Sequence, residues 1–442
     1  MGHKRSKFFI SNFNDDDGNA YYYHTSTGSM LKVSQGQLAS LEEMISNPEA
    51  ASPLVLERLI ETGFVIKNDV DEVQQVQQMA LHRNYNKSDH LELTILPTEQ
   101  CNFRCVYCYE DFKLPVMSEE HQESLIKYVR KEMAHRKGLS VGWFGGEPLM
   151  ALPVIEKLST AFIEICELNK KPYNATVTTN AYTLDVSNFE RLRNYRVNHF
   201  QITIDGPRQT HDKQRVLMNG SPTFDKILNN LCEIRDKAKG RIWTIAIRTN
   251  VTKPMLKHMD EYTDMINKNF GNDKRFMIQI RQMWTNNTEE ADDIVIDEES
   301  FGRFIDTCSL AGFSLSQDYK FTHNLNYICY AGKPHSFVIR SNGDVHKCTA
   351  QIHVEGRQIG KLEMDGNLNI NMSHIAKWCV PTIDKLNHCK NCGFFGACAG
   401  IGCPIREVNE CEAVINYIRP YLHAFYKIAP KAYEMTEYLQ RR

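Results

Sequence analysis

Residues 91–110 read LELTILPTEQCNFRCVYCYE, a short apolar strand pattern followed at once by a cysteine array. Cys101, Cys105 and Cys108 have the spacing CxxxCxxC. A zinc site built on these residues would need a second cysteine pair elsewhere to complete its tetrahedron. Three thiolates from one tight loop suit instead three irons of a [4Fe–4S] cube, and they leave the fourth iron open to a small ligand.

The strand at 91–97 begins a regular alternation that continues to about residue 313. Five more strand patterns follow, at 139–146, 174–180, 199–206, 243–251 and 275–283, with helical patterns between and after them. Six β/α units in order predict an α/β fold with a parallel sheet covered by helices. Continuous winding allows a doubly wound sheet, but six units favour a partial (β/α)6, TIM-like barrel. In either fold the chemistry belongs at the carboxyl ends of the strands.

Polar and glycine residues gather at those predicted strand ends. The second strand ends in WFGGEPLM, the third in a Thr-Asn pair and the fourth in QITIDGPRQTHDKQR. Glycines let a backbone approach a ligand closely. The alternative for WFGGEPLM is a plain strand-to-helix turn with a surface glutamate. Arg248 and Asn250, at the end of the fifth strand, are weaker candidates for the same site. The alternative for them is an ordinary polar strand end.

The cysteine array, with an aromatic Tyr107 before its last cysteine and its place after strand one of a β/α barrel, resembles the radical SAM superfamily. The resemblance implies a [4Fe–4S] cluster on Cys101, Cys105 and Cys108 and S-adenosylmethionine (SAM) bound at its open iron. It further implies a SAM-dependent oxidoreductase in which reductive cleavage of SAM yields a 5′-deoxyadenosyl radical. Glu147 would accept from the SAM ammonium, and Arg215 would either reach the SAM carboxylate or lie on a helix surface. The other implied SAM-binding residues are Tyr107, Gly145, Gly146, Thr179, Asn180, Thr203 and Asp205.

Eight of the fourteen cysteines lie beyond residue 320, in a segment with little periodic pattern. Such a segment buries too little apolar surface to fold by hydrophobicity alone, and inorganic clusters would supply the missing cross-links. The pattern from Gly343-x4-Cys348 to HCKNCGFFGACAGIGCP resembles the SPASM domain; zinc is the alternative. Cys403 departs from the pattern because four residues, not three, separate it from Cys398.

The SPASM resemblance implies two auxiliary [4Fe–4S] clusters, which with the first makes three. Some relatives place a further cysteine where this chain has His323, so auxiliary cluster I could keep an open iron. The implied ligands are Cys329, Cys348 and Cys403 for auxiliary cluster I, and Cys389, Cys392, Cys398 and Cys411 for auxiliary cluster II.

Residues 1–67 contain three strand patterns and two helical patterns and predict a winged-helix-like domain. By pattern and position it resembles the peptide-binding domain of maturases that act on ribosomally made peptides, which pairs a leader peptide with a sheet edge. A cap or dimerisation domain is the alternative. The predicted organisation is this domain, a linker at 68–90, the barrel at 91–313 and the SPASM module with its terminal helix at 319–442.

Composition and hydropathy argue against a nucleic-acid-binding, membrane-spanning or secreted protein. The 442 residues carry 52 Lys plus Arg against 54 Asp plus Glu, a balance that argues against nucleic-acid binding through phosphates. The sequence has no apolar stretch of about 18 residues, so we expect no membrane span. The N-terminus lacks a secretory signal pattern. We therefore expect a cytoplasmic protein.

These features together predict a radical SAM/SPASM maturase that abstracts hydrogen from a precursor peptide and installs a cross-link, first of all a cysteine thioether. Its partners would be the precursor peptide, whose leader binds the N-terminal domain, and an electron donor such as flavodoxin or ferredoxin. Alternatives are formylglycine formation of the anaerobic sulfatase-maturase kind and a C–C or C–O cross-linking maturase. A non-catalytic iron–sulfur or zinc scaffold would have no use for Glu147.

Overall fold

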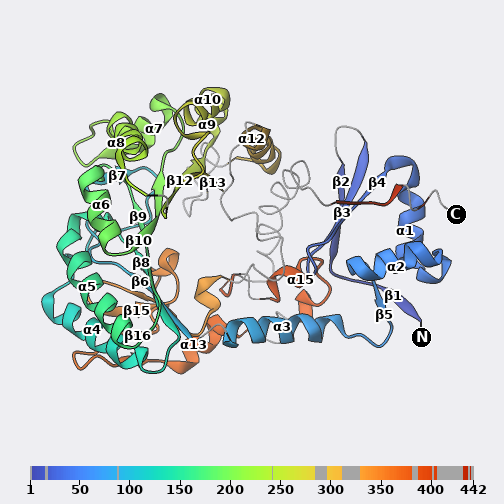
Figure 1. The fold of residues 1–442 in the computed structure, drawn as a ribbon, viewed down its shortest axis with the longest axis horizontal. Helices are drawn as coiled ribbons and strands as arrows, with labels where there is room; N and C mark the ends of the chain where they lie inside the picture. The colour runs from blue at the N-terminus through green and yellow to red at the C-terminus, as the bar shows by residue number, and fades with distance from the viewer. Residues whose placement is uncertain are drawn as a thin grey trace. The chain divides into compact units, whose positions relative to one another are not determined.

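The structure is a computed structural model that describes residues 2–14, 18–86, 89–240, 242–283, 296–310, 329–380, 387–400, 403–405, 432–436 and 439 (Figure 1). The chain divides into two compact units. Unit 1 comprises Met1–Asn86, Gln317–Gly332 and Cys379–Arg442, and unit 2 comprises Lys87–Ser316 and Lys333–Trp378. His323 and Cys411 lie outside the described residues.

Unit 2 contains the predicted partial (β/α)6 barrel. Six parallel strands lie side by side in the order β13-β12-β10-β9-β8-β6, and at least one helix follows each strand along the chain. Figure 1 shows α4, α5 and α6 along one side of the strands. The strands are β6 (His90–Ile95), β8 (Gly138–Trp143), β9 (Tyr173–Thr179), β10 (Val197–Thr203), β12 (Thr244–Val251) and β13 (Phe276–Gln282). The helices are α4 (Glu119–Met133), α5 (Leu152–Leu168), α6 (Val186–Asn194), α7 (Arg208–Gln214), α8 (Phe224–Lys237), α9 (Lys253–Leu256), α10 (Met259–Phe270) and α12 (Glu298–Leu310).

The two faces of this sheet differ in chemistry. Along β6, β9 and β12 the residues alternate between buried apolar side chains and polar ones that are mostly part-exposed, as the period of a strand requires. The apolar face is covered by helices, whose buried residues include Leu125, Phe162 and Leu231. The other face therefore lines the inside of the barrel with polar groups, among them Thr94, Thr176, Thr178, Arg248 and Gln279.

The barrel sheet does not end at β6. β14 (Ser336–Ile339) pairs parallel with β6, and β15 (Asp344–His346), β16 (Gly360–Leu362) and β17 (Leu368–Ile370) continue the sheet in antiparallel pairs. α13 (Met372–Cys379) follows. The hairpin that holds Gly343 and leads to Cys348 is thus a continuation of the barrel sheet.

Unit 1 is built on a four-stranded sheet in the order β18-β4-β3-β2. β2 (Phe9–Asn14), β3 (Asn19–His24) and β4 (Met30–Ser34) form an antiparallel meander, whereas β18 (Ala432–Glu434) comes from the far end of the chain and pairs parallel with β4. α1 (Leu38–Ser46) and α2 (Pro53–Thr62) complete the winged-helix-like pattern. The other elements are β1 (His3–Arg5), which pairs with β5 (Val65–Lys67), and α3 (Glu72–Asn86).

The segment 387–400 packs on the same unit. It carries Cys389, Cys392 and Cys398 around the single turn α15 (Phe395–Cys398). The ring of Phe395, which is fully buried, lies 5.3 Å from that of Phe8. Thr25 Oγ1 donates to the carbonyl oxygen of Gly393 at 2.6 Å. The cysteine segment therefore shares one small apolar core with Phe8, which directly precedes β2, and with helix α3.

No helix in the described ranges is long and apolar enough to cross a bilayer.

Candidate active site

The cysteine loop begins where β6 ends, at the carboxyl edge of the sheet. Within the loop, β7 (Phe103–Cys105) pairs antiparallel with β11 (Arg215–Leu217), and Cys105 stands opposite Arg215 in the register. Val106 N also donates to the carbonyl oxygen of Gln214 at 3.0 Å. The loop is therefore fixed to the segment that follows β10, at the end of the barrel where chemistry was expected.

The three thiols fit a cluster better than a single ion. Burial raises the pKa of Cys101 to about 12 and that of Cys108 to about 11, and it raises the pKa of Cys105 as well. The thiols lie close enough to raise one another's pKa values. Three thiolates suit three irons of a [4Fe–4S] cube but leave the tetrahedron of a zinc ion incomplete, and the irons supply the positive charge that buried thiolates need.

Glu147 is a fully buried carboxylate, which excludes the surface-glutamate alternative. Its Oε1 accepts from Thr179 Oγ1 at 2.7 Å and from Leu149 N at 3.1 Å, and its Oε2 accepts from Asn180 N at 2.6 Å. Burial raises the pKa of this carboxyl, and these donors oppose the shift. A carboxylate offers about four acceptor positions, so one position on Oε2 is left for a further donor such as an ammonium.

Gly145 and Gly146 approach the backbone that leads into the cysteine loop. A Cβ on Gly146 would lie 2.4 Å from the carbonyl oxygen of Gln100, and one on Gly145 would lie 2.3 Å from that of Thr98. Gly145 also has a φ of 115°, which disfavours any side chain. Glu147 N donates to Gln100 O at 2.9 Å. The glycines thus bring the end of β8 against the chain's own backbone beside Cys101.

The predicted SAM-binding residues of the cysteine loop and of the segments after β9 contact one another. Tyr107 donates to Asp205, which is fully buried, and Arg215 donates to the Tyr107 hydroxyl at 2.8 Å. Thr203 is buried at the end of β10. Asn180 Nδ2 donates to Asn102 Oδ1 at 2.8 Å, next to Cys101. The structure therefore brings together residues from the ends of four strands around the cysteine loop, and their contacts with SAM remain predictions.

A second polar cluster was not predicted from the sequence. Glu99, Glu110 and His353 bring their ligand atoms within 4.8 Å of one another. Arg340 donates to both oxygens of Glu99, at 2.8 and 2.7 Å, and so already places a cation there. His353 Nε2 lies 3.2 Å from Glu110 Oε2. Because some 240 residues separate the two halves, no local pattern could have revealed the cluster.

Seven of the eight C-terminal cysteines lie among the described residues. Cys329, Cys348 and Cys403 are half-buried, and Cys389 is buried. Cys389, Cys392 and Cys398 lie in the segment that packs on Phe8. Their assignment to auxiliary clusters remains a prediction, and Cys411 falls outside the described residues.

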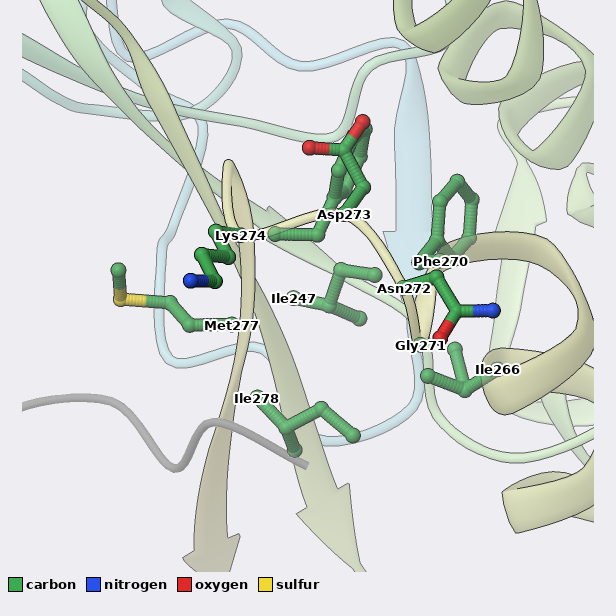
Figure 2. A pocket seen from close by; sticks show the side chains of 10 residues that line it. Ile247, Ile266, Phe270, Gly271, Asn272, Asp273, Lys274, Met277 and Ile278 are labelled. Atoms are coloured by element: carbon green, nitrogen blue, oxygen red, sulfur yellow. The ribbon is translucent and has the colours of Figure 1, made fainter. Parts of the chain in front are cut away.

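A pocket of about 520 Å³ lies elsewhere in unit 2 (Figure 2). Its lining runs from Ile266 on α10 through the turn at Gly271 to Ile278 on β13, with Ile247 on β12. These residues surround the amino-terminal start of β13, whereas the cysteine loop and Glu147 follow carboxyl ends. The pocket is therefore separate from the candidate active site.

Comparison with known proteins agrees with this geometry. Residues 95–247 match the Radical SAM superfamily. The chain is 25% identical over 346 residues to a cysteine-type anaerobic sulfatase-maturating enzyme of Clostridium novyi, covering 71% of this chain and 87% of the relative. Its fold is similar to anSMEcpe with bound AdoMet and Kp18Cys peptide, with a TM-score of 0.59, 20% identity and coverage of 76% and 98%. It is also similar to Streptococcus suis SuiB bound to precursor peptide SuiA, with a TM-score of 0.51, 16% identity and coverage of 93% and 97%.

The matched residues contain the cysteine loop, Glu147 and the ends of the first four barrel strands. Residues 95–247 accordingly form a Radical SAM superfamily domain, and the arrangement of its cysteine loop and Glu147 fits the binding of SAM beside a [4Fe–4S] cluster.

Proposed function

We propose that this radical SAM enzyme is a cytoplasmic SPASM-type maturase that modifies a ribosomally made precursor peptide. The observation that carries the proposal is the hydrogen bond from Glu147 N to Gln100 O, which joins the start of the cysteine loop to a buried carboxylate at the carboxyl edge of a barrel with a polar inner face. When bound, SAM and the cluster supply a 5′-deoxyadenosyl radical, and the protein contributes binding and orientation.

Different residues of this chain bind the cluster, SAM and the peptide. Cys101, Cys105 and Cys108 hold the cluster. Glu147 accepts from the SAM ammonium through the free position on Oε2, because Thr179 Oγ1 and Leu149 N occupy Oε1 and Asn180 N occupies the other position on Oε2. The polar, half-exposed inner face of the sheet then holds the peptide segment that loses hydrogen.

The C-terminal cysteines hold two further clusters in this proposal. Auxiliary cluster I takes Cys329, Cys348 and Cys403, and auxiliary cluster II takes the remaining four predicted ligands, Cys389, Cys392, Cys398 and Cys411. A flavodoxin or ferredoxin supplies electrons. The similarity to SPASM-type enzymes and the cysteine spacing support this set.

The leader peptide adds to the sheet of unit 1. The edge of β4 is taken by β18, where Met435 N donates to Lys32 O at 2.7 Å, and the fully buried Met435 packs into the core. Within the described residues β2 is the strand at the other end of this sheet. An extended peptide can pair with such an edge through its backbone. We therefore place the leader on β2. The SuiB structure with its precursor peptide supports a peptide ligand for this kind of fold.

The product we propose first is a thioether from a peptide cysteine to carbon. The likeness to a sulfatase-maturating enzyme favours formylglycine formation as the second candidate. The third is a C–C or C–O cross-link. Each leaves a different mark on a cysteine-containing peptide.

The test is mass spectrometry of peptides encoded by short reading frames beside the gene, after anaerobic incubation with enzyme, SAM and dithionite. A thioether makes the peptide two hydrogens lighter, keeps its sulfur and removes one thiol from alkylation. Formylglycine formed from cysteine loses the sulfur. A C–C or C–O cross-link leaves every thiol free to alkylate. Cleavage of SAM without any change in these peptides would contradict the maturase proposal.

A further inference from the structure

One tyrosine hydroxyl holds the second half of the cysteine loop. Tyr107 lies between Cys105 and Cys108, and its hydroxyl donates to Asp205 Oδ2. The same oxygen accepts from Arg215 Nη1 at 2.8 Å and from Asn250 Nδ2 at 3.2 Å. A phenol offers one donor and two acceptor positions. All of these positions are filled by side chains of the barrel.

The partners of the hydroxyl are themselves fixed. Asp205 is fully buried just after β10, and its Oδ1 accepts from Asn250 N, in β12, at 2.8 Å. Arg215 begins β11, which pairs with the first half of the loop, and its Nη1 lies 3.9 Å from Asp205 Oδ2. The two opposite charges balance inside the protein. The hydroxyl therefore ties the loop to three separate strands.

The backbone of the Cys105–Cys108 turn forms a hydrogen bond within the loop. Cys108 N donates back to the carbonyl oxygen of Cys105 at 3.1 Å, within the loop itself. The ring of Tyr107 and its hydroxyl thus form the side-chain connection between the Cys105–Cys108 turn and the barrel. A shift of this hydroxyl would move the two cysteines relative to Cys101.

We propose that Tyr107 and Asp205 are positioning residues for the [4Fe–4S] cluster: their hydrogen bond sets how Cys105 and Cys108 present their thiols. This inference rests on the cluster assignment made under the proposed function. The family resemblance implied a contact of Asp205 with SAM, whereas the geometry directs its carboxylate to the loop. Groups that hold metal ligands in place act on the affinity and the electronic properties of the site without touching the metal.

The test uses the full chain, reconstituted anaerobically, with the variants Tyr107→Phe and Asp205→Asn. The readouts are the part of the reduced EPR spectrum that changes when SAM is added, and the rate at which this cluster loses iron to a chelator. Tyr107→Phe keeps the ring and removes the hydroxyl, which leaves Asp205 short of a donor. We expect a weaker SAM-induced spectral change and iron loss about tenfold faster than in the wild type.

The double variant separates a shared bond from two independent defects. If Tyr107 acts through Asp205, Tyr107→Phe adds nothing further in an Asp205→Asn background. Tyr109→Phe is the matched control, since it removes a hydroxyl from the same loop at a ring that is 39% exposed. A wild-type spectrum and iron-loss rate for Tyr107→Phe, or additive effects in the double variant, overturns the inference. Absence of any SAM-sensitive signal in the wild type overturns the proposed function, and the inference with it.

Discussion

Two cysteine-bearing regions of this protein obtain their geometry in different ways. Around Cys101, hydrogen bonds at the ends of parallel strands position the loop: Glu147 binds Thr179 and Asn180 N, and Tyr107 binds Asp205. Around Cys392, the segment 387–400 relies on apolar packing, chiefly Phe395 on Phe8. The first arrangement is a property of the barrel. The second depends on Phe8, just before β2 and nearly 390 residues away in the chain.

The difference matters for how each region responds to damage. A strand-end network should keep its shape when a distant module is disturbed, because its partners belong to one sheet. A short segment with a single turn of helix has little apolar surface of its own, and it needs both its packing partners, Phe8 and α3, and a bound cluster. The following changes are ordered from the largest expected effect to the smallest.

Replacing Cys101, Cys105 and Cys108 together with alanine should abolish SAM cleavage completely. Counting ten ligand cysteines into three clusters gives about 12 irons per chain, of which about 8 should remain in the variant. Anaerobic iron and sulfide assays with chromatography of 5′-deoxyadenosine measure both quantities. A value near 4 irons in the wild type would contradict the two auxiliary clusters.

Phe395→Ala should destabilise unit 1 by about 3–5 kcal/mol, the usual cost of removing a buried phenylalanine ring. We expect faster hydrogen exchange in β2 and β3 and loss of about 4 irons, while SAM cleavage persists. Leu54→Ala, at a side chain that is 43% exposed, is the control. If SAM cleavage fell in parallel with the iron, the two regions would not be independent.

Glu147→Gln should weaken SAM binding by roughly tenfold to a hundredfold, because a buried charged acceptor is worth about 1.5–3 kcal/mol. The glutamine amide would also point an N–H group at donors that in the wild type meet a carboxylate oxygen. Equilibrium binding of SAM to the reconstituted enzyme measures the effect. Glu164→Gln, on the exposed side of α5, should bind as the wild type does. Equal affinity for both variants would remove Glu147 from the SAM site.

Gly146→Ala should destabilise the barrel by about 1–3 kcal/mol, the range for overpacking, since the new Cβ would lie 2.4 Å from a backbone oxygen. Gly142→Ala, within β8, places a Cβ that meets nothing closer than 3.5 Å and should be nearly neutral. Thermal unfolding of the two variants under identical reconstitution gives the comparison. Equal melting temperatures would show that the end of β8 can move away from the cysteine loop.

Much of the barrel could be predicted because its signals are local. The alternation of strand and helix patterns, and the position of each motif after a strand, follow from the sequence periods. The comparisons and the structure confirm the partial barrel and the radical SAM domain. Gly146 was expected to approach a ligand, and the close neighbour that the structure gives it is the backbone at Gln100.

What the sequence could not provide are the long-range contacts. Tyr107 and Asp205 are separated by 98 residues, and Thr25 and Gly393 by 368, so no spacing rule connects them. The pairing of β18 with β4 is of the same kind. A three-residue strand has no periodic signal of its own, and its place is decided by the edge that accepts it.

The most direct test of the central claim is deuterium transfer from peptide to 5′-deoxyadenosine. The reconstituted enzyme is incubated anaerobically with SAM, dithionite and a precursor peptide, from a neighbouring reading frame, that carries deuterium on its carbon-bound positions. We predict that 5′-deoxyadenosine gains deuterium in proportion to the modified peptide, and that the Cys101/Cys105/Cys108 variant forms none. Modified peptide accompanied by unlabelled 5′-deoxyadenosine would contradict hydrogen abstraction from the peptide in this barrel.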